Sequence, residues 1–312
     1  MAKPGLLLIY PYMDYMAGLI SDRFDLLKLW EESDPDKAIA ERGAGVVAIL
    51  TTGNEKIDGA LMDRLPGLKV IVAVGAGYGG IVVPEARKRG ITVTNAGDTH
   101  SADVADHAVG MVLGLVQKLR FNDDYVRDGE WLAKGFPKHR PSMSAQRFGI
   151  LGLGRIGRAV GDRLAPFGGE IAWWGPNDRV APWPRLSSPL ELARWCSVLI
   201  VACRGDAGQL VPRAVVDAVG ENGYIVNVAR GAVIDEQAMI DALNESRLAG
   251  VGLDVFETEP LDPQRWAGVP NAILSPHAAG LTIEAMDRLR EAAATNLKTA
   301  LDGGAVLNEI FA

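Results

Sequence analysis

The chain has 312 residues, which is long for a single core and predicts about two domains. Apolar residues make up 48% and charged residues 23%, as in a soluble globular enzyme, and no apolar run approaches the roughly 18 residues of a membrane span. The net charge of −7, without a dense block of Lys or Arg, argues against nucleic acid and anionic membranes as partners.

We expect a cytoplasmic protein. The N-terminal apolar run 6–10 is too short for a signal peptide and is followed at once by Pro11. The two cysteines, Cys196 and Cys203, fit no zinc or redox spacing, so we expect reduced, buried thiols.

The first hundred residues alternate short apolar runs with polar, helix-compatible segments. This alternation predicts a parallel, doubly wound α/β sheet. The expected strands are Leu6–Tyr10, Leu26–Trp30, Val46–Leu50, Val70–Val74 and Ile91–Thr94.

A long helix is expected over Ser101 to Leu119, because its apolar residues recur at the spacing of one helix face. The segment Arg120 to Ser144 then combines polar residues with Trp131 and Phe136 and has little regular pattern. We interpret it as a long loop, and such loops in compact proteins are usually functional or interface elements.

A glycine-rich turn, Gly152-Leu153-Gly154-Arg155-Ile156-Gly157, follows an apolar run and opens an amphipathic stretch. This is the strand–turn–helix context of a dinucleotide site, with a structural turn as the alternative. Gly152 permits the tight turn, Gly154 lets the backbone approach a pyrophosphate, and Gly157 lets the helix pack close to the strand. Because about 150 residues precede the turn, another domain comes first.

Strand-like runs continue after the turn, and polar residues follow three of them. The runs are Ile171–Trp174, Val198–Ala202, Tyr224–Val228, Gly250–Val255 and Ile273–Ser275, and a last helix is expected from Thr282 to Asp302.

Arg230, the pair Asp254 and Glu259, and His277 stand where strands end, which is where open α/β sheets bind ligands. An arginine there could grip a carboxylate, and a carboxylate beside an imidazole favours a protonated general acid. The alternatives are a solvated arginine and a structural histidine. No histidine pair has metal-ligand spacing, so we expect no metal site.

In this order the residues resemble the D-isomer-specific 2-hydroxyacid dehydrogenases over nearly the whole chain. The matching segments are Val74-Gly75-Ala76-Gly77, Val104-Ala105-Asp106-His107, the glycine turn, Asn227-Val228-Ala229-Arg230-Gly231, Gly252 to Pro260 and Ser275-Pro276-His277. The resemblance implies two doubly wound parallel-sheet domains. A Rossmann cofactor domain, residues 99–282, would be inserted in a flavodoxin-like substrate domain, residues 1–98 and 283–312, which explains the late position of the glycine turn.

The resemblance also implies the roles of individual residues. Arg230 would bind the carboxylate and carbonyl oxygen of a 2-keto acid, and His277 would protonate that oxygen as hydride arrives from a nicotinamide. Glu259 would orient His277 and keep it protonated. Related formate dehydrogenases carry glutamine in place of Glu259, so the glutamate favours a keto acid/hydroxy acid couple.

Backbone amides of Val74, Gly75, Ala76 and Gly77 would bind the substrate carboxylate, and Asp254 would contact the nicotinamide carboxamide. The full set of expected cofactor contacts is Gly152, Gly154, Arg155, Ile156, Gly157, Trp174, Gly175, Asn177, Arg179, Val228, Ala229 and Asp254.

The residue expected to choose the cofactor departs from the NAD pattern. NAD sites usually place a carboxylate about twenty residues past the glycines, and Gly175 stands there instead. Asn177 and Arg179 offer donors to a 2′-phosphate. Asp178 could either pair with Arg179 or repel the phosphate. We therefore expect NADP(H), with NAD(H) as the alternative.

The function expected is reduction of a small 2-keto acid to the D-2-hydroxy acid, most like the glyoxylate/hydroxypyruvate reductases. Tyr78 and the segment Trp131–Phe136 are candidates for the pocket wall, with interface packing as the alternative for Trp131. The helix 101–119 and the segment after it resemble the family's dimerisation arm, which predicts a homodimer. The rival functions are an NAD-dependent dehydrogenase of a bulkier 2-hydroxy acid and a nucleotide-sensing binding protein similar to the C-terminal-binding-protein corepressors.

Overall fold

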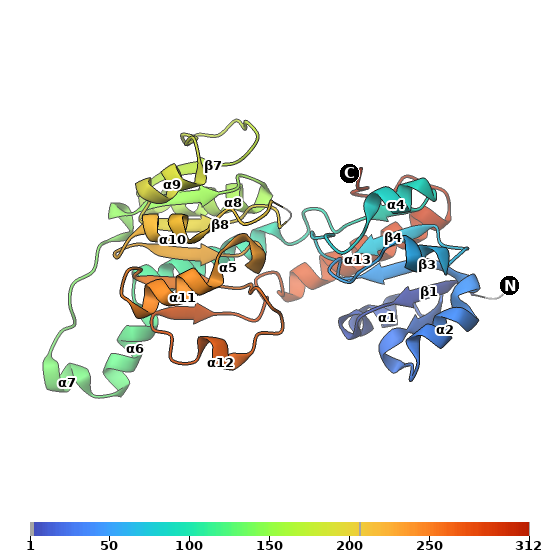
Figure 1. Cartoon of the computed structure of the whole chain (residues 1–312), viewed down its shortest axis with the longest axis horizontal. Coiled ribbons are helices and arrows are strands. Elements are labelled where there is room, and N and C mark those ends of the chain that lie inside the picture. Colours follow the sequence, from blue (N-terminus) through green and yellow to red (C-terminus); the bar gives the residue numbers. More distant parts are fainter. Residues whose placement is uncertain (1–2, 206, 312) are drawn as a thin grey trace. The chain divides into compact units, whose positions relative to one another are not determined.

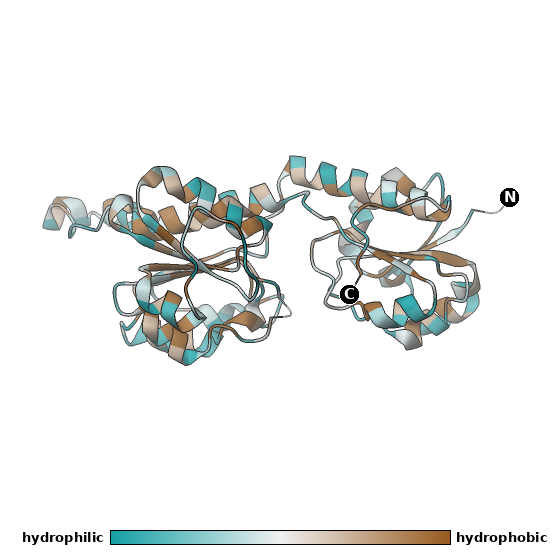
Figure 2. Ribbon diagram, turned by 90° about the horizontal axis from the view of Figure 1, so that it is seen from above, coloured by the Kyte–Doolittle hydropathy of each residue, from teal (hydrophilic) through white to brown (hydrophobic). Residues whose placement is uncertain are grey.

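The computed structural model describes residues 3–205 and 207–311, which form two compact units. Unit 1 consists of Met1–His100 and Ile283–Ala312, and unit 2 is the intervening Ser101–Thr282. In each unit helices cover both faces of a central sheet (Figure 1). The strands are the hydrophobic middle layer, and the polar residues of the helices lie outside (Figure 2). The expected α/β class with two parallel-sheet domains is confirmed.

Unit 1 has a five-stranded parallel sheet in the order β2-β1-β3-β4-β5, which is the flavodoxin-like order. Its strands are near-continuous apolar runs, as burial on both faces requires. They are β1 Gly5–Leu8, β2 Asp25–Lys28, β3 Val46–Thr51, β4 Val70–Ala73 and β5 Thr92–Thr94. The helices are α1 Asp14–Ile20, α2 Pro35–Arg42, α3 Gly59–Asp63, α4 Val83–Lys88 and α13 Ile283–Leu301.

Unit 2 has a six-stranded parallel sheet in the order β11-β10-β9-β8-β6-β7. The strands are β6 Arg147–Leu151, β7 Glu170–Trp174, β8 Val198–Val201, β9 Tyr224–Asn227, β10 Gly250–Leu253 and β11 Ala272–Leu274. The helices are α5 Ser101–Val116, α8 Arg155–Leu164, α9 Pro189–Trp195, α10 Arg213–Val219, α11 Glu236–Asn244 and α12 Pro263–Trp266.

A single parallel bridge between Trp173 and Arg185 lies beside β7. It occupies the place of the third strand in the Rossmann order 3-2-1-4-5-6. The chain therefore reverses direction across the sheet between β6 and β8, and such a switch point is where α/β sheets bind ligands.

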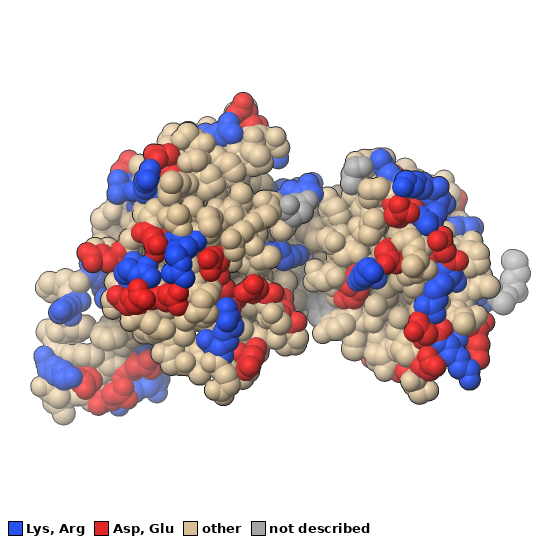
Figure 3. All heavy atoms as spheres, in the orientation of Figure 1, with Lys and Arg blue, Asp and Glu red and all other residues tan. Residues whose placement is uncertain are grey.

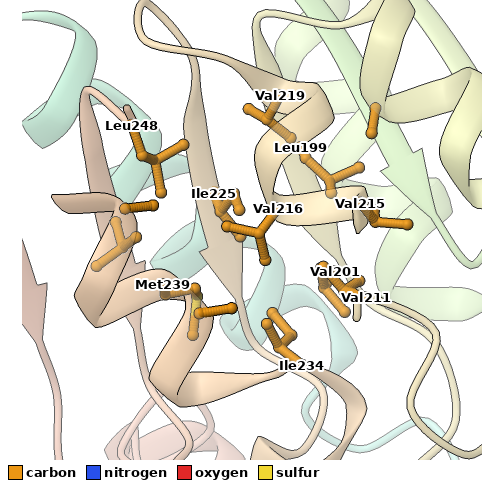
Figure 4. Packing of buried hydrophobic residues seen from close by; sticks show 14 of the residues in the cluster. Leu199, Val201, Val211, Val215, Val216, Val219, Ile225, Ile234, Met239 and Leu248 are labelled. Carbon is orange, nitrogen blue, oxygen red and sulfur yellow. The ribbon is translucent and has the colours of Figure 1, made fainter. Parts of the chain in front are cut away.

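One hydrophobic core of unit 2 lies between the sheet and helices α10 and α11. Leu199 and Ile225 of the strands pack against Val216 of α10 and Met239 of α11, and all four are at most 2% exposed (Figure 4). Aliphatic side chains of this kind each contribute about 1.5–3 kcal/mol when fully buried. This packing makes the strand ends a rigid platform for the loops that follow them.

The segment 120–144 is not the loop that the sequence predicts. It contains two helices, α6 Leu119–Arg127 and α7 Glu130–Lys134. No residue of α6 is buried, so the helix lacks the core-facing stripe by which periodicity is recognised. Contacts four residues apart stabilise it instead: the rings of Phe121 and Tyr125 stack at 5.6 Å, and Arg127 donates to Asp123 at 2.8 Å.

Both cysteines are thiols, and their environments differ. Cys196 is buried, and burial raises the pKa of its thiol to about 12, so it stays protonated. Cys203 is only partly buried, so the expectation that both thiols are buried is wrong for this one. It follows β8 and lies against the glycine turn.

Acidic and basic side chains are interspersed over the surface of each unit in the view of Figure 3. Many form ion pairs, such as Arg213 with Asp241 at 2.5 Å. Within the ranges that the structure describes, no helix combines the length and apolar character needed to cross a membrane.

Candidate active site

Arg230, Glu259 and His277 all lie on loops at one edge of the unit 2 sheet. They come shortly after the ends of β9, β10 and β11, which are neighbours in that sheet. Parallel strands present their carboxyl ends at the same edge, so residues 29 and 18 positions apart in sequence come together there.

His277 and Glu259 form a hydrogen-bonded pair. The distance from His277 Nδ1 to Glu259 Oε2 is 2.7 Å, and the second carboxylate oxygen accepts the N–H of Phe256 at 2.9 Å. His277 takes a φ of 53°, in the left-handed region that is uncommon for residues other than glycine. Strain of this kind concentrates at active sites. Glu259 thus holds the imidazole through Nδ1, and the pairing leaves Nε2 available for other contacts.

The carboxyl of Glu259 is held ionised. Its partial burial, the largest single effect, acts to raise its pKa, whereas the hydrogen bond from His277 acts to lower it. The amide of Phe256 and the charges of His277 and Arg230 lower the pKa further, so that it falls below its ordinary value of 4.5. An ionised carboxylate in this position stabilises a protonated imidazole.

The pKa of Glu259 predicts how stability depends on pH. Because the folded-state pKa is lowered, ionised Glu259 stabilises the folded protein above the unfolded pKa, and this contribution is lost as the pH falls through the folded pKa. The deficit of Glu259→Gln in free energy of unfolding should therefore shrink between about pH 7 and about pH 3 in urea titrations. A deficit that stays constant over this range would contradict the interaction.

Arg230 is a partly buried cation next to the pair. Burial lowers its pKa, while the charges of Glu259 and Asp254 oppose that shift, and a guanidinium stays protonated in proteins. Its Nη1 donates to the carbonyl of Ala229 at 2.7 Å. Gly205 packs against it so closely that a Cβ there would lie 2.5 Å from Arg230 Cγ. The arginine side chain is thus held in place before any ligand binds.

Asp254 ties the His277 segment to β10. It is 2% exposed, and its two oxygens accept the amides of Ala278 at 2.8 Å and Ala279 at 3.1 Å. The amide of His277 also donates to the Asp254 carbonyl at 2.8 Å, and His107 Nε2 lies 3.7 Å from Oδ1. Besides any contact with a cofactor, this carboxylate has a structural role that the sequence did not indicate.

The three glycines of the turn between β6 and α8 meet three different constraints. Gly152 has a φ of 100°, and a Cβ there would lie 2.5 Å from Cys203 Cα. A Cβ on Gly157 would lie 2.0 Å from the Gly152 carbonyl oxygen, so only glycine allows helix and strand to approach this closely. Gly154 faces open space and directly precedes α8, whose first two residues are Arg155 and Ile156. This geometry fits a pyrophosphate at the helix N-terminus.

The loop after β7 places two of the expected cofactor-selecting residues, Asn177 and Arg179, at the surface. Trp174 is partly buried and Gly175 is buried, whereas Asn177 and Arg179 are exposed. Asp178 forms an ion pair with Arg185 and not with Arg179, the partner considered from the sequence.

Arg185 is a residue that the sequence did not single out. Its Nε and Nη2 donate to the carbonyl of Gly175 at 3.2 and 2.7 Å, and its guanidinium lies 5.7 Å from the centre of the Trp173 ring. The one signal in the sequence is a basic residue just after Pro182-Trp183-Pro184, where the third Rossmann strand would run. Arg185 anchors the start of the loop after β7 and forms an ion pair with Asp178.

Val228 and Ala229 are buried just beyond β9. Their amides donate to the Val201 carbonyl at 3.1 Å and to Asn227 Oδ1 at 3.0 Å, which fixes the backbone leading into Arg230.

In unit 1, the loop Val74–Gly77 follows β4. Val74 is buried, while Gly75, Ala76 and Gly77 are partly exposed. Asn95 donates its side-chain amide to the Ala76 carbonyl at 2.8 Å, and the Ala96 amide donates to Gly75 at 3.0 Å. A Cβ on Gly53 would lie 2.1 Å from the Gly77 carbonyl oxygen. The loop is therefore rigid within its unit.

The aromatic candidates for the pocket wall have different environments. Tyr78 packs against the core of unit 1. Trp131 and Phe136 are exposed, with ring centres 6.1 Å apart. In the part of the chain that the structure describes, no group of three or more His, Cys, Asp or Glu could hold a metal ion.

Comparison with known proteins places this site in a family. Residues 109–279 match the model of the D-isomer specific 2-hydroxyacid dehydrogenase NAD binding domain. The chain is 36% identical over 300 residues to the 2-ketogluconate reductase of Gluconobacter oxydans, covering 95% of each chain.

Solved structures resemble the chain over its full length. The 2-hydroxyacid dehydrogenase of Ketogulonicigenium vulgare Y25 is 34% identical, with a TM-score of 0.92 over 100% of this chain and 99% of that one. The NADPH-dependent glyoxylate/hydroxypyruvate reductase of Sinorhizobium meliloti, solved with NADP and malonate, is 30% identical, with a TM-score of 0.87 over 99% and 97%. The chain therefore belongs to the D-isomer specific 2-hydroxyacid dehydrogenase family.

Proposed function

We propose that the protein reduces a small 2-keto acid, of the glyoxylate or hydroxypyruvate type, to the D-2-hydroxy acid. The observation that carries this proposal is the 2.7 Å pair between His277 and Glu259, with the guanidinium of Arg230 close enough to affect the pKa of Glu259. A proton donor next to a carboxylate-binding cation is the combination that reduction of a 2-keto acid requires. The relatives named above are reductases or dehydrogenases of such acids.

Each of the three residues has one step in the proposed mechanism. Arg230 binds the substrate carboxylate in bidentate fashion and polarises the keto oxygen. His277 donates the proton from Nε2 to that oxygen, and Glu259 stabilises the imidazolium until transfer. A bound nicotinamide supplies the hydride. The backbone amides of Val74–Gly77 would add donors for the carboxylate, as the family resemblance implies.

The chirality of the product tests this mechanism. Reduction of hydroxypyruvate by the purified protein should yield the D enantiomer, measured by chiral chromatography. Formation of the L enantiomer, or of a racemate, would contradict the assignment.

We further propose that unit 2 is the cofactor domain and that it prefers NADP(H), with NAD(H) used less well. Gly175 replaces the carboxylate that would repel a 2′-phosphate, and Asn177 and Arg179 are exposed beside it. Asp178, a carboxylate of the same loop, is paired with Arg185. The Sinorhizobium neighbour is described as NADPH-dependent.

Arg185→Gln tests the cofactor preference. The substitution frees the charge of Asp178 beside the proposed phosphate site, so repulsion should make NADP+ bind about tenfold more weakly relative to NAD+. Asp178→Asn should shift the ratio of the two Kd values toward NADP+. Both are measured by calorimetry, with Arg194→Gln, an exposed arginine paired with Glu191, as the control. If Arg185→Gln weakened the binding of both cofactors equally, Arg185 would have only a structural role in the loop and none in cofactor preference.

We propose a homodimer located in the cytoplasm. The segment 119–136 carries six exposed large apolar residues, and exposed apolar patches often mark an interface. The six residues that support the dimer are Leu119, Phe121, Val126, Trp131, Leu132 and Phe136. Two cysteines that are both thiols are compatible with a reducing compartment. Sedimentation equilibrium should give twice the 33.3 kDa of the chain, and a monomer mass would contradict the dimer.

A further inference from the structure

The turn that carries Glu259 is packed directly against the residue after Arg230. A Cβ built on Gly231 would lie 1.9 Å from the carbonyl carbon of Phe256 and 2.3 Å from the amide nitrogen of Glu257. No residue with a Cβ fits at this position unless the backbone moves. The positions of Arg230 and of the turn 256–259 are therefore linked through this contact.

Glu236, the first residue of α11, is buried in the same region. It is 4% exposed, and its Oε2 accepts the amide of Glu257 at 2.9 Å. Its Oε1 accepts Arg265 Nε at 2.5 Å and Trp266 Nε1 at 3.3 Å. Three donors, one of them charged, satisfy a carboxylate whose burial would otherwise be costly. Glu236 thus joins α11 to the turn with one oxygen and to α12 with the other.

An acidic residue at a helix N-terminus ordinarily interacts with the exposed amides of that helix. Here Asp235 has that role, because its side chain accepts the amide of Ala238 at 2.9 Å. The carboxylate of Glu236 reaches instead across to a loop 21 residues later. Helix capping therefore does not account for its position.

Two successive amides of the turn are each bound by a glutamate. Phe256 donates to Glu259, which pairs with His277, and Glu257 donates to Glu236. We propose that Glu236 is a positioning residue, which holds the turn 256–259 so that Glu259 meets His277 Nδ1 in the geometry needed for proton transfer. This inference rests on the proposed function. Displacement of a reacting group by about 1 Å costs on the order of a hundredfold in rate.

Glu236→Gln is the direct test. Glutamine keeps one acceptor oxygen and loses the charge, so it cannot hold both the Glu257 amide and Arg265. We expect kcat to fall about 10- to 100-fold, while KM and Kd for NADPH stay unchanged. Asp241→Asn, on the same helix but paired with Arg213 and Gln237, is the matched control and should retain full activity.

A double-mutant cycle with Glu259→Gln separates positioning from general destabilisation. If Glu236 acts through Glu259, then Glu236→Gln should change kcat less than about twofold in the Glu259→Gln background. The alkaline limb of the pH–rate profile should also move to lower pH in the single Glu236→Gln variant. The proposal would be overturned if Glu236→Gln lowered kcat by the same factor in the wild-type and Glu259→Gln backgrounds, or if it left the pH–rate profile unchanged.

A second variant keeps the test valid if Glu236→Gln fails to fold. Arg265→Gln removes a partly exposed partner from Oε1 and leaves the bond to the Glu257 amide. Arg265→Gln should lower kcat by a few-fold in the wild-type background and by less in the Glu259→Gln background. Equal effects on kcat in the two backgrounds would count against the proposal. If the wild-type protein reduces no 2-keto acid, the proposed function fails; if it does and the cycle is additive, only the role of Glu236 fails.

Discussion

Replacing His277 by Asn should lower kcat for 2-keto acid reduction by about 10³-fold and leave the Kd for NADP+ unchanged. Asparagine has no acidic proton to transfer, so the keto oxygen must take its proton from water. Cofactor binding is unaffected in this account, because the glycine turn and the loop after β7 are built without the imidazole. Stopped-flow measurement of NADPH oxidation and calorimetry of NADP+ binding provide the two readouts.

The matched control for this variant is His139→Asn, because His139 is an exposed histidine in the same unit. It should retain wild-type turnover. Turnover within a few-fold of wild type in His277→Asn would show that another group supplies the proton. The pairing with Glu259 would then be structural.

Arg230→Gln should lower kcat/KM for the keto acid by about 10³-fold, through a higher KM and a lower kcat together. The guanidinium is the proposed partner of both the carboxylate and the developing oxyanion, and loss of one such donor alone costs about 10² to 10³ in rate. Arg230→Lys should recover only part of the loss, since an ammonium keeps the charge but not the bidentate geometry.

Arg247→Gln is the control for Arg230 and should be fully active, because Arg247 is a partly exposed arginine paired with Asp217 and Glu245. Steady-state kinetics with the keto acid varied at saturating NADPH make the comparison. If Arg230→Gln raised KM for NADPH and left that for the keto acid unchanged, Arg230 would belong to the cofactor site.

Much of the fold follows from the sequence for a physical reason. Parallel strands buried on both faces are near-continuous apolar runs, so β3 at Val46–Thr51 and β8 at Val198–Val201 are recognised to within about a residue. The glycine turn is visible for a similar reason, since only glycine meets the constraints at Gly152 and Gly157.

The features that the sequence did not reveal depend on local polar contacts or on pairs distant along the chain. Helix α6 is stabilised by its own side-chain pairs rather than by a buried stripe. The ion pair between Arg185 and Asp178 joins the loop after β7 to the residue that bridges Trp173, a contact that no local pattern in the sequence indicates. Glu236 is typical of a helix start in the sequence, and only the fold brings it to the turn that carries Glu259.

The central claim is that the protein is an NADPH-preferring reductase of small 2-keto acids. It is tested most directly by following NADPH and NADH absorbance with glyoxylate, hydroxypyruvate, pyruvate and phenylpyruvate, each with both cofactors. We predict the highest kcat/KM for glyoxylate or hydroxypyruvate with NADPH, and a lower value for phenylpyruvate. A preference for NADH with the bulkier acid, or tight cofactor binding without turnover of any acid, would contradict this account.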